Sequence, residues 1–407
     1  MGYTKQAVHG FGWQTFLKIG SAGLVLGKIA VLSRLLTPED FGIFAIIAIA
    51  LGLVEASTQT GINTTILQSN RSISYFIDTA WVIAIVRGLI IAIIMSILGF
   101  GLSIYYDKEN LRFLIALAAL VPIAKGFINP SIILFQKEFR FLHEALFRLS
   151  LLFVEILVAI VVAFFFHSVL ALVVAIIASA IFEVFLSFKI FSTRPTFSFH
   201  TGRAKEILIN ARGLSPAALL IYVLDNVDDL IIGKQLGAYS LGLYHNSYAL
   251  GHKLNYDISK ALNHSTFPVY TKIAEDRLRL RDAFAKSSLA FMAFAVFITL
   301  PAILFPTQIV AIILGDQWQN VASVLPLLAI AGLVQSGNNL VYNLLMATKR
   351  YVILNAHLFF SVLTLIGGLL YFVNRNGLIG TGQALLLARC ITLPILVFGL
   401  YDIFRKR

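Results

Sequence analysis

Cysteine and acidic side chains are scarce in this chain of 407 residues, which has 20 Asp and Glu against 32 Lys and Arg. Its one cysteine, Cys390, offers neither an internal disulfide nor a thiolate metal site. Catalytic motifs are missing as well, because the sequence has no HExxH or paired-cysteine motif and no recognisable set of nucleophile, histidine and acid. These absences predict a protein that is not an enzyme and that holds no metal ion or cofactor.

Long apolar stretches take up most of the sequence instead. Hydrophobic residues make up 58% of the chain, charged residues make up 13%, and the mean hydropathy is +0.86. Each of twelve stretches reaches the ~20 residues that a helix needs to cross a hydrocarbon layer of ~30 Å. We therefore predict an all-α membrane protein with twelve transmembrane helices, at roughly 11–36, 41–67, 76–101, 111–135, 145–166, 169–192, 208–236, 241–262, 286–306, 323–347, 352–373 and 377–403.

The basic residues lie almost entirely on one side of this predicted topology. Of the 32 lysines and arginines, 22 lie at the termini and in the even-numbered connections, and five lie in the odd-numbered connections. Lys and Arg accumulate in cytoplasmic loops, so we expect both termini in the cytoplasm and the protein in a bacterial or archaeal plasma membrane. The net charge of +12 then faces anionic membrane lipids, and nucleic acid is not an expected partner.

The two halves of the chain repeat one pattern. At an offset of 200 residues, Arg34 falls on Lys234 and Gly42 falls on Gly242, and with ten more residues of offset Asn129 falls on Asn339. Similarity of composition alone is the alternative explanation, but these matches are polar residues and glycines near loop edges. Matched spans enter the membrane from the same side, so the repeat is parallel. We predict two six-helix bundles, 1–195 and 196–407, related by a pseudo-two-fold axis.

Five basic residues lie well inside the predicted spans, away from their ends: Lys18, Lys28, Arg87, Lys125 and Arg389. A charge at membrane depth is expensive and indicates a wet cavity or a partner. We interpret these five as candidate substrate-binding residues, because a phosphate accepts charge-assisted hydrogen bonds from Lys and Arg. Lys18 has the alternative of extending to the cytoplasmic interface. Glu155 and Glu183 are expected to be internal partners of these cations.

Three carboxylates share one face of the seventh span. Asp225, Asp228 and Asp229 have the spacing i, i+3, i+4. Clustered carboxylates repel one another, so a proton or a cation should balance them. They are candidates for cation coupling or gating, and the alternative is a structural polar face paired with basic residues. Lys28 falls on Asp228 in the repeat, so a gate formed by this pair is a further hypothesis.

Two other segments carry structural expectations. The basic, amphipathic connection 267–286 is expected to lie flat on the cytoplasmic surface as a helix between two spans. His167, His245, His252 and His264 are expected to be interfacial histidines, because they lie near the ends of spans.

Several short motifs resemble those of one transporter family. They are Leu32–Gly42 in the first loop, Gln136–Phe141 after the fourth span, Phe267-Pro268 after the eighth and Leu314–Trp318 after the ninth. In this order they resemble the polysaccharide-transporter, Wzx-like oligosaccharide flippases of the MOP exporter superfamily, and most of all the colanic acid and teichuronic acid exporters. The similarity covers nearly the whole chain.

The resemblance implies a function. It implies a flippase that moves a polyprenyl-diphosphate-linked oligosaccharide from the cytoplasmic to the outer leaflet by alternating access, with spans 1, 2, 7 and 8 bordering the cleft. Implied partners are the lipid-linked sugar, membrane lipids and a polysaccharide polymerase or assembly proteins. Two alternatives stay open: a cation-coupled efflux carrier of the multidrug, MATE-like branch, and a non-transporting scaffold of an assembly complex. A cationic first half favours an anionic substrate, whereas an acidic one favours drug cations.

Overall fold

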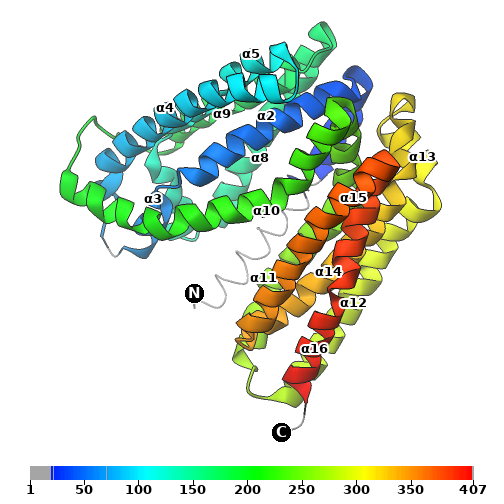
Figure 1. Cartoon of the computed structure of the whole chain (residues 1–407). Helices are drawn as coiled ribbons and strands as arrows, with labels where there is room; N and C mark the ends of the chain where they lie inside the picture. Colours follow the sequence, from blue (N-terminus) through cyan, green and yellow to red (C-terminus); the bar gives the residue numbers. More distant parts are fainter. Residues whose placement is uncertain (1–19, 22, 70, 406–407) are drawn as a thin grey trace. The chain divides into compact units, whose positions relative to one another are not determined.

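The computed structural model describes residues 20–405 apart from 22 and 70, and every regular element in this part of the chain is a helix (Figure 1). The candidate residue Lys18 lies outside the described residues. The chain divides into two compact units, Met1–Leu36 with Ile43–Asn226 (unit 1) and Thr37–Gly42 with Val227–Arg407 (unit 2). The long helix α10, Thr201–Tyr248, begins in unit 1 and ends in unit 2.

Unit 1 is built from long apolar helices joined by short ones. Residues 20–35 are helical except for the undescribed position 22. The following helices are α2 (Pro38–Ser57), whose first residues up to Gly42 belong to unit 2, α3 (Ile62–Gln68), α4 (Ile73–Tyr105), α5 (Glu109–Ala118), α6 (Leu120–Gly126), the 3-10 helix η1 (Pro130–Ile133), α7 (Leu134–Lys137), α8 (Phe141–Phe166) and α9 (Leu170–Ile190).

Unit 2 continues with helices of the same kind. They are a π-helical turn η2 (Ala249–Lys253), α11 (Leu254–Lys272), α12 (Arg277–Leu304), α13 (Pro306–Ile313), the 3-10 helix η3 (Asp316–Ser323), α14 (Leu325–Ala347), α15 (Tyr351–Ile391) and α16 (Leu393–Phe404). Helix α14 packs against α11, α12 and α15, and its buried residues make it the centre of this unit.

Large apolar side chains cover the outside of these helices. On α8, Phe153, Leu157, Val161, Phe164 and Phe165 are exposed by 48% to 71% of their surface. A helix whose backbone groups are satisfied internally and whose apolar face is not covered by protein suits a lipid environment. Among the described residues, six helices are long and apolar enough to cross a membrane, or up to eight if two bent helix pairs each count as one span. The chain is therefore an all-helical membrane protein.

Glycines break two helices at the places where the sequence predicts loops between spans. Gly237, with φ at 80°, interrupts α10, and Gly377, with φ at 54°, interrupts α15. Positive φ is the left-handed region, which glycine adopts without the steric cost that a Cβ brings. By length and composition, the apolar segment Tyr351–Phe404 is one of the six candidate membrane-spanning segments. It includes the residues of two of the spans that the sequence predicts.

The segment 267–286 does not form a separate element between two helices, as the expected lever on the surface would. Helix α11 continues through Pro268 to Lys272, and α12 begins at Arg277, where the side chain of Asp276 accepts a hydrogen bond from the backbone N–H of Arg279. The amphipathic pattern belongs to the adjoining ends of two long helices, because Tyr270 and Leu280 are buried together in one core cluster. A good N-cap at Asp276 starts α12 earlier than the hydropathy suggests.

Two glycines allow a backbone crossing inside unit 2. A Cβ added to Gly42 would lie 1.7 Å from the carbonyl oxygen of Ala238, and one added to Gly242 would lie 1.8 Å from that of Pro38. The contact is reciprocal at the 200-residue offset, because Pro38 and Gly42 correspond to Ala238 and Gly242. Each backbone approaches the other through the gap that the missing side chains leave.

We expect Gly242→Ala to destabilise the protein, since the added methyl group collides with a backbone atom rather than with a movable side chain. Overpacking of this kind costs about 1–3 kcal/mol, and thermal unfolding of the purified protein in detergent measures it. Gly101→Ala is the matched control, because a Cβ there meets no atom within 4 Å. Equal unfolding temperatures for Gly242→Ala and wild type would contradict the crossing.

Candidate functional site

Lys28 forms an ion pair with a carboxylate of another helix in unit 1. Its Nζ lies 2.5 Å from Oε1 of Glu155 on α8, and the two side chains are 16% and 23% exposed. The expectation that Glu155 is an internal partner of these cations is therefore confirmed. Removing the charge of an ammonium group from water is unfavourable in free energy, and burial of the side chain does not compensate for it. An ammonium group that is largely covered by protein therefore needs an opposite charge as a partner.

Arg87 caps the end of another helix. Its guanidinium donates from Nε to the carbonyl oxygen of Thr58 (2.7 Å) and from Nη2 to that of Glu55 (2.9 Å), at the C-terminal end of α2. The last carbonyl groups of a helix lack internal partners and carry partial negative charge. Arg87 therefore has a structural task in this conformation.

Lys125 is the most accessible described cation of the candidate set in unit 1. Its Nζ, on α6, lies 3.2 Å from Oε1 of Glu55, and these side chains are 42% and 30% exposed. The charges of Lys125, Arg148 and Glu55 also act on Glu183 of α9. The pair is open enough for a ligand to contact Lys125, and any anion that does so competes with Glu55.

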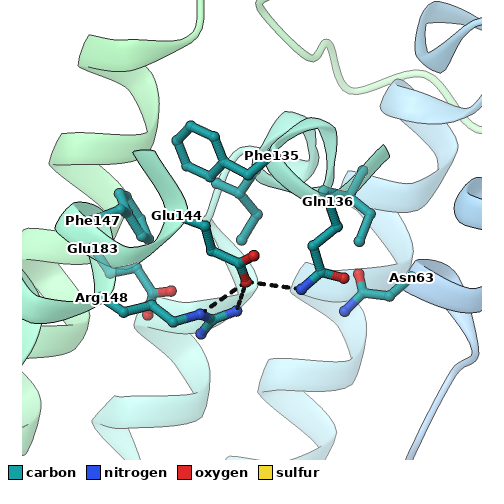
Figure 2. Close-up of a pocket in the computed structure, with 9 residues that line it drawn as sticks. Asn63, Phe135, Gln136, Glu144, Phe147, Arg148 and Glu183 are labelled. Carbon is teal, nitrogen blue, oxygen red and sulfur yellow. Dashed lines mark hydrogen bonds and ion pairs between the residues drawn. The ribbon is translucent and has the colours of Figure 1, made fainter. Parts of the chain in front are cut away.

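A second charged cluster lies where α3, α7, α8 and α9 meet (Figure 2). Glu144 Oε1 accepts hydrogen bonds from Arg148 Nε (3.0 Å), Arg148 Nη2 (2.9 Å) and Gln136 Nε2 (2.8 Å). Glu183 and Asn63 line the same pocket. In the sequence, Glu144 and Arg148 lie near the predicted start of a span at residue 145, and so they look like residues of a cytoplasmic loop. For this reason neither was a candidate site residue.

The three aspartates of α10 have different environments. Asp225 is exposed, whereas Asp228 is buried and accepts a hydrogen bond of 2.5 Å from the hydroxyl of Tyr244. Asp229 Oδ2 lies 4.0 Å from Nδ1 of His245, and its Oδ1 is buried with no hydrogen-bond partner among the described residues. The i, i+3, i+4 spacing therefore brings Asp228 and Asp229 into the protein and leaves Asp225 at its surface.

Arg389 belongs to this buried cluster of unit 2. Its charge acts on Asp228, Tyr248 and His252. Its Nε is buried and has no hydrogen-bond partner in the described part of the chain. The structure thus brings the one basic candidate of the second half toward the aspartates of the same unit.

An aromatic row follows one helix face of unit 2. Tyr244, Tyr248, His252 and Tyr256 recur every four residues, and the rings of Tyr248 and His252 stack with centroids 4.4 Å apart. The four-residue spacing is a signal that the sequence contains and that our sequence-based candidates did not include. The sequence contains no comparable signal for the π-helical turn η2. Turns of this kind often occur at functional sites.

The interfacial assignment of His252 is wrong. The side chain is 1% exposed and lies inside unit 2, where a Cβ on Gly332 would lie 2.7 Å from its Cα. Gly332 lets α14 approach the π-helical turn closely enough to cover the ring. His245 and His167, by contrast, are exposed.

We expect charge reversal to identify Glu155 as the partner of Lys28. Lys28→Glu and Glu155→Lys each place like charges together in a covered position, which costs about 3–5 kcal/mol for a buried pair. The double variant restores the attraction. Thermal unfolding of both single variants and the double variant gives the coupling energy, and a double variant that unfolds no later than the worse single variant refutes the pairing.

Comparisons with known proteins match this architecture. The family model described as "Polysaccharide biosynthesis protein" matches residues 31–323. The lipopolysaccharide biosynthesis protein WzxC of Escherichia coli (strain K12) is 23% identical over 403 residues, which cover 96% of this chain and 80% of WzxC.

Two solved structures share the fold. The lipid II flippase MurJ, in an inward closed conformation, has a TM-score of 0.75 at 12% identity, over 96% of this chain and 88% of MurJ. An inward-facing multidrug resistance MATE family transporter of the MOP superfamily has a TM-score of 0.65 at 14% identity, over 95% and 94% of the two chains. At these identities the likeness concerns the fold alone. The resemblance noted in the sequence motifs is confirmed, and the chain belongs to the polysaccharide biosynthesis protein family, a family of Wzx-like transporters rather than enzymes.

Proposed function

We propose that this protein is a flippase that moves a polyprenyl-diphosphate-linked oligosaccharide from the cytoplasmic to the outer leaflet by alternating access. Membership of the polysaccharide biosynthesis family supports the substrate class. The fold shared with a lipid II flippase supports a carrier rather than a scaffold, since MurJ acts on another lipid-linked molecule. The observation that carries the proposal is the Lys125–Glu55 pair, which offers the most accessible of the described candidate cations of unit 1.

The proposal includes the full topology. Twelve spans form two bundles, 1–195 and 196–407, with both termini in the cytoplasm and a parallel repeat between the bundles. Two pairs of repeat-related residues support it: Gly42 and Gly242 make the reciprocal crossing, and Asn129 and Asn339 are both buried. Asn129 Nδ2 donates to the carbonyl oxygen of Thr193 and Asn339 Nδ2 donates to Ser259 Oγ, both at 2.8 Å.

The phosphate contacts fall to the accessible cations in this proposal. Lys125 exchanges Glu55 for a phosphate oxygen, and Lys28 can do the same with Glu155 once the substrate displaces that carboxylate. A diphosphate offers several acceptor oxygens and more than one negative charge, so it competes well with one carboxylate. Arg87 holds the end of α2 in place so that Glu55 faces Lys125. Lys18 and Arg389 remain proposed phosphate contacts, of lower priority than Lys125 and Lys28. Arg389 has this lower priority because it lies among the aspartates.

Asp228 and Asp229 are the proposed coupling or gating residues, with Asp225 at the exposed end of the same face. Two adjacent carboxylates inside a membrane protein repel each other, while the charge of Arg389 acts on Asp228 and that of Lys253 acts on Asp229. A proton or a cation that binds there changes the charge of the cluster by one unit. Such a change can bias a two-state carrier toward one conformation.

The test is export of surface polysaccharide by cells that carry Lys125→Gln in place of the wild-type protein. We expect export to fall about tenfold or more, because loss of a charge-assisted hydrogen bond to phosphate costs about 1.5 kcal/mol or more. Lys125→Arg should retain partial export, since Arg also binds phosphate. Lys189→Gln, on the exposed end of α9, is the matched control for removal of one charge.

Protein levels in the membrane are measured alongside, so that a folding defect is not mistaken for a transport defect. Normal export by Lys125→Gln at normal protein level would remove the support for an anionic substrate. Loss of export in Glu55→Gln together with normal export in Lys125→Gln would favour the cation-coupled carrier of the multidrug branch.

A further inference from the structure

The pocket between α3, α7, α8 and α9 has one polar wall and one apolar wall. Asn63, Gln136, Glu144, Arg148 and Glu183 form the polar wall, and Figure 2 shows Glu144 between Arg148 and Gln136, with Glu183 beside Arg148 and Asn63 beside Gln136. The apolar wall consists of Ile132, Ile133, Phe135 and Phe147. All of these residues belong to unit 1, and they are separate from the phosphate-binding and coupling residues proposed above.

One carboxylate oxygen in this pocket has no donor in the described part of the chain. Oε1 of Glu144 accepts three hydrogen bonds, two from Arg148 and one from Gln136. Oε2 of the same carboxylate is buried and has no hydrogen-bond partner among the described residues, and Glu144 as a whole is 4% exposed. A buried carboxylate oxygen is costly unless something donates to it or coordinates it.

The charges of the lining favour one further positive charge. Glu144 and Glu183 contribute two negative charges, and Arg148 contributes one positive charge, so the lining has a net charge of −1. An anion would add to the imbalance, and a divalent cation would reverse it. The neutral residues Asn63 and Gln136 each carry an amide oxygen, which is a suitable ligand for a hard cation.

We propose that this pocket is a binding site for a small monovalent cation, either Na⁺ or a proton. Both satisfy the free oxygen of Glu144 and cancel the excess negative charge. Glu144 contacts Arg148 on α8 and the uncharged Gln136 on α7, and Glu183 on α9 and Asn63 on α3 line the same pocket. Lys125 and Glu55 are the further charges that act on Glu183, and they cancel each other in number. The site is distinct from the aspartates of unit 2, so the carrier has two places where a cation acts.

Binding of a cation in this pocket changes the electrostatic environment of the proposed phosphate-binding pair, Lys125 and Glu55. The charge of Glu183 acts on Lys125 as well as on Arg148. A cation beside Glu183 reduces its attraction for Lys125, and Lys125 becomes easier to transfer to a phosphate. This consequence rests on the proposed function, whereas the cation site itself does not.

The experiment measures cation binding and thermal unfolding of the full-length protein in nanodiscs, without substrate. Binding of ²²Na⁺ is counted at pH 8 in an Asp228→Asn, Asp229→Asn background, which removes the aspartates of unit 2. Unfolding temperature is measured in NaCl against choline chloride at equal ionic strength, and from pH 8 down to pH 5. Glu183→Gln is the main variant, because it leaves the three hydrogen bonds of Glu144 intact, and Glu144→Gln is the second.

If Na⁺ is the ligand, we expect about one bound Na⁺ per chain and a higher unfolding temperature in NaCl, since a ligand stabilises the state that binds it. If a proton is the ligand, no Na⁺ binds and the unfolding temperature rises as the pH falls. Either effect is lost in Glu183→Gln and in Glu144→Gln. It is retained in Glu138→Gln, which removes a carboxylate paired with Arg140 at the surface.

The proposal is overturned if neither Na⁺ nor pH shifts the unfolding temperature of the background protein. It is also overturned if the shift persists in both Glu183→Gln and Glu144→Gln. Because no step uses the lipid-linked substrate, failure here leaves the flippase proposal untouched, and failure of the export test leaves the cation site untouched.

Discussion

A charged side chain inside a hydrocarbon layer needs an opposite charge or several hydrogen bonds from the protein around it, and the rest of this structure depends on that constraint. Unit 1 meets it with the ion pairs Lys28–Glu155, Lys125–Glu55 and Arg148–Glu144, and with the hydrogen bonds of Arg87 to the end of α2. Because these charges have partners within the unit, its helices can present long apolar surfaces such as that of α8. Under the proposed function, a substrate anion must displace a carboxylate of the protein.

Partner exchange explains why a carrier keeps such pairs. An isolated lysine in a dry site would bind a phosphate so tightly that release would be slow, whereas a lysine that returns to Glu55 recovers most of the attraction. The same constraint has a different solution in unit 2, where Asp228 is held by a tyrosine hydroxyl and by the charge of Arg389. Lys28 and Asp228 are equivalent positions of the proposed repeat, and each has a partner within its own unit in this conformation. The proposed transport cycle would change these partners without changing the number of charges in the membrane.

Much of the fold could be predicted from the sequence, because hydropathy and charge vary over distances of a whole span. The helical class, the family and the breaks at Gly237 and Gly377 follow from apolar runs, loop motifs and glycines. The sequence could suggest that Lys28 pairs with a carboxylate inside the unit, but it could not show that Lys28 pairs with Glu155. The two residues are 127 positions apart and are brought together only by packing. The capping role of Arg87 could not be predicted, because nothing in its own helix shows that the end of α2 lies beside it. His252 looked interfacial because a π-helical turn and a close approach at Gly332 have no hydropathy signal.

The central claim is that a phosphate of the substrate and the carboxylate of Glu55 compete for Lys125. The most direct measurement is the affinity of the purified protein in nanodiscs for a short polyprenyl diphosphate, compared between wild type, Glu55→Gln and Lys125→Gln. Competition predicts that Glu55→Gln binds the diphosphate several-fold more tightly than wild type, because the competing charge is gone while Lys125 remains. It also predicts weaker binding by Lys125→Gln. An affinity of Glu55→Gln that is equal to or lower than that of wild type would contradict the account.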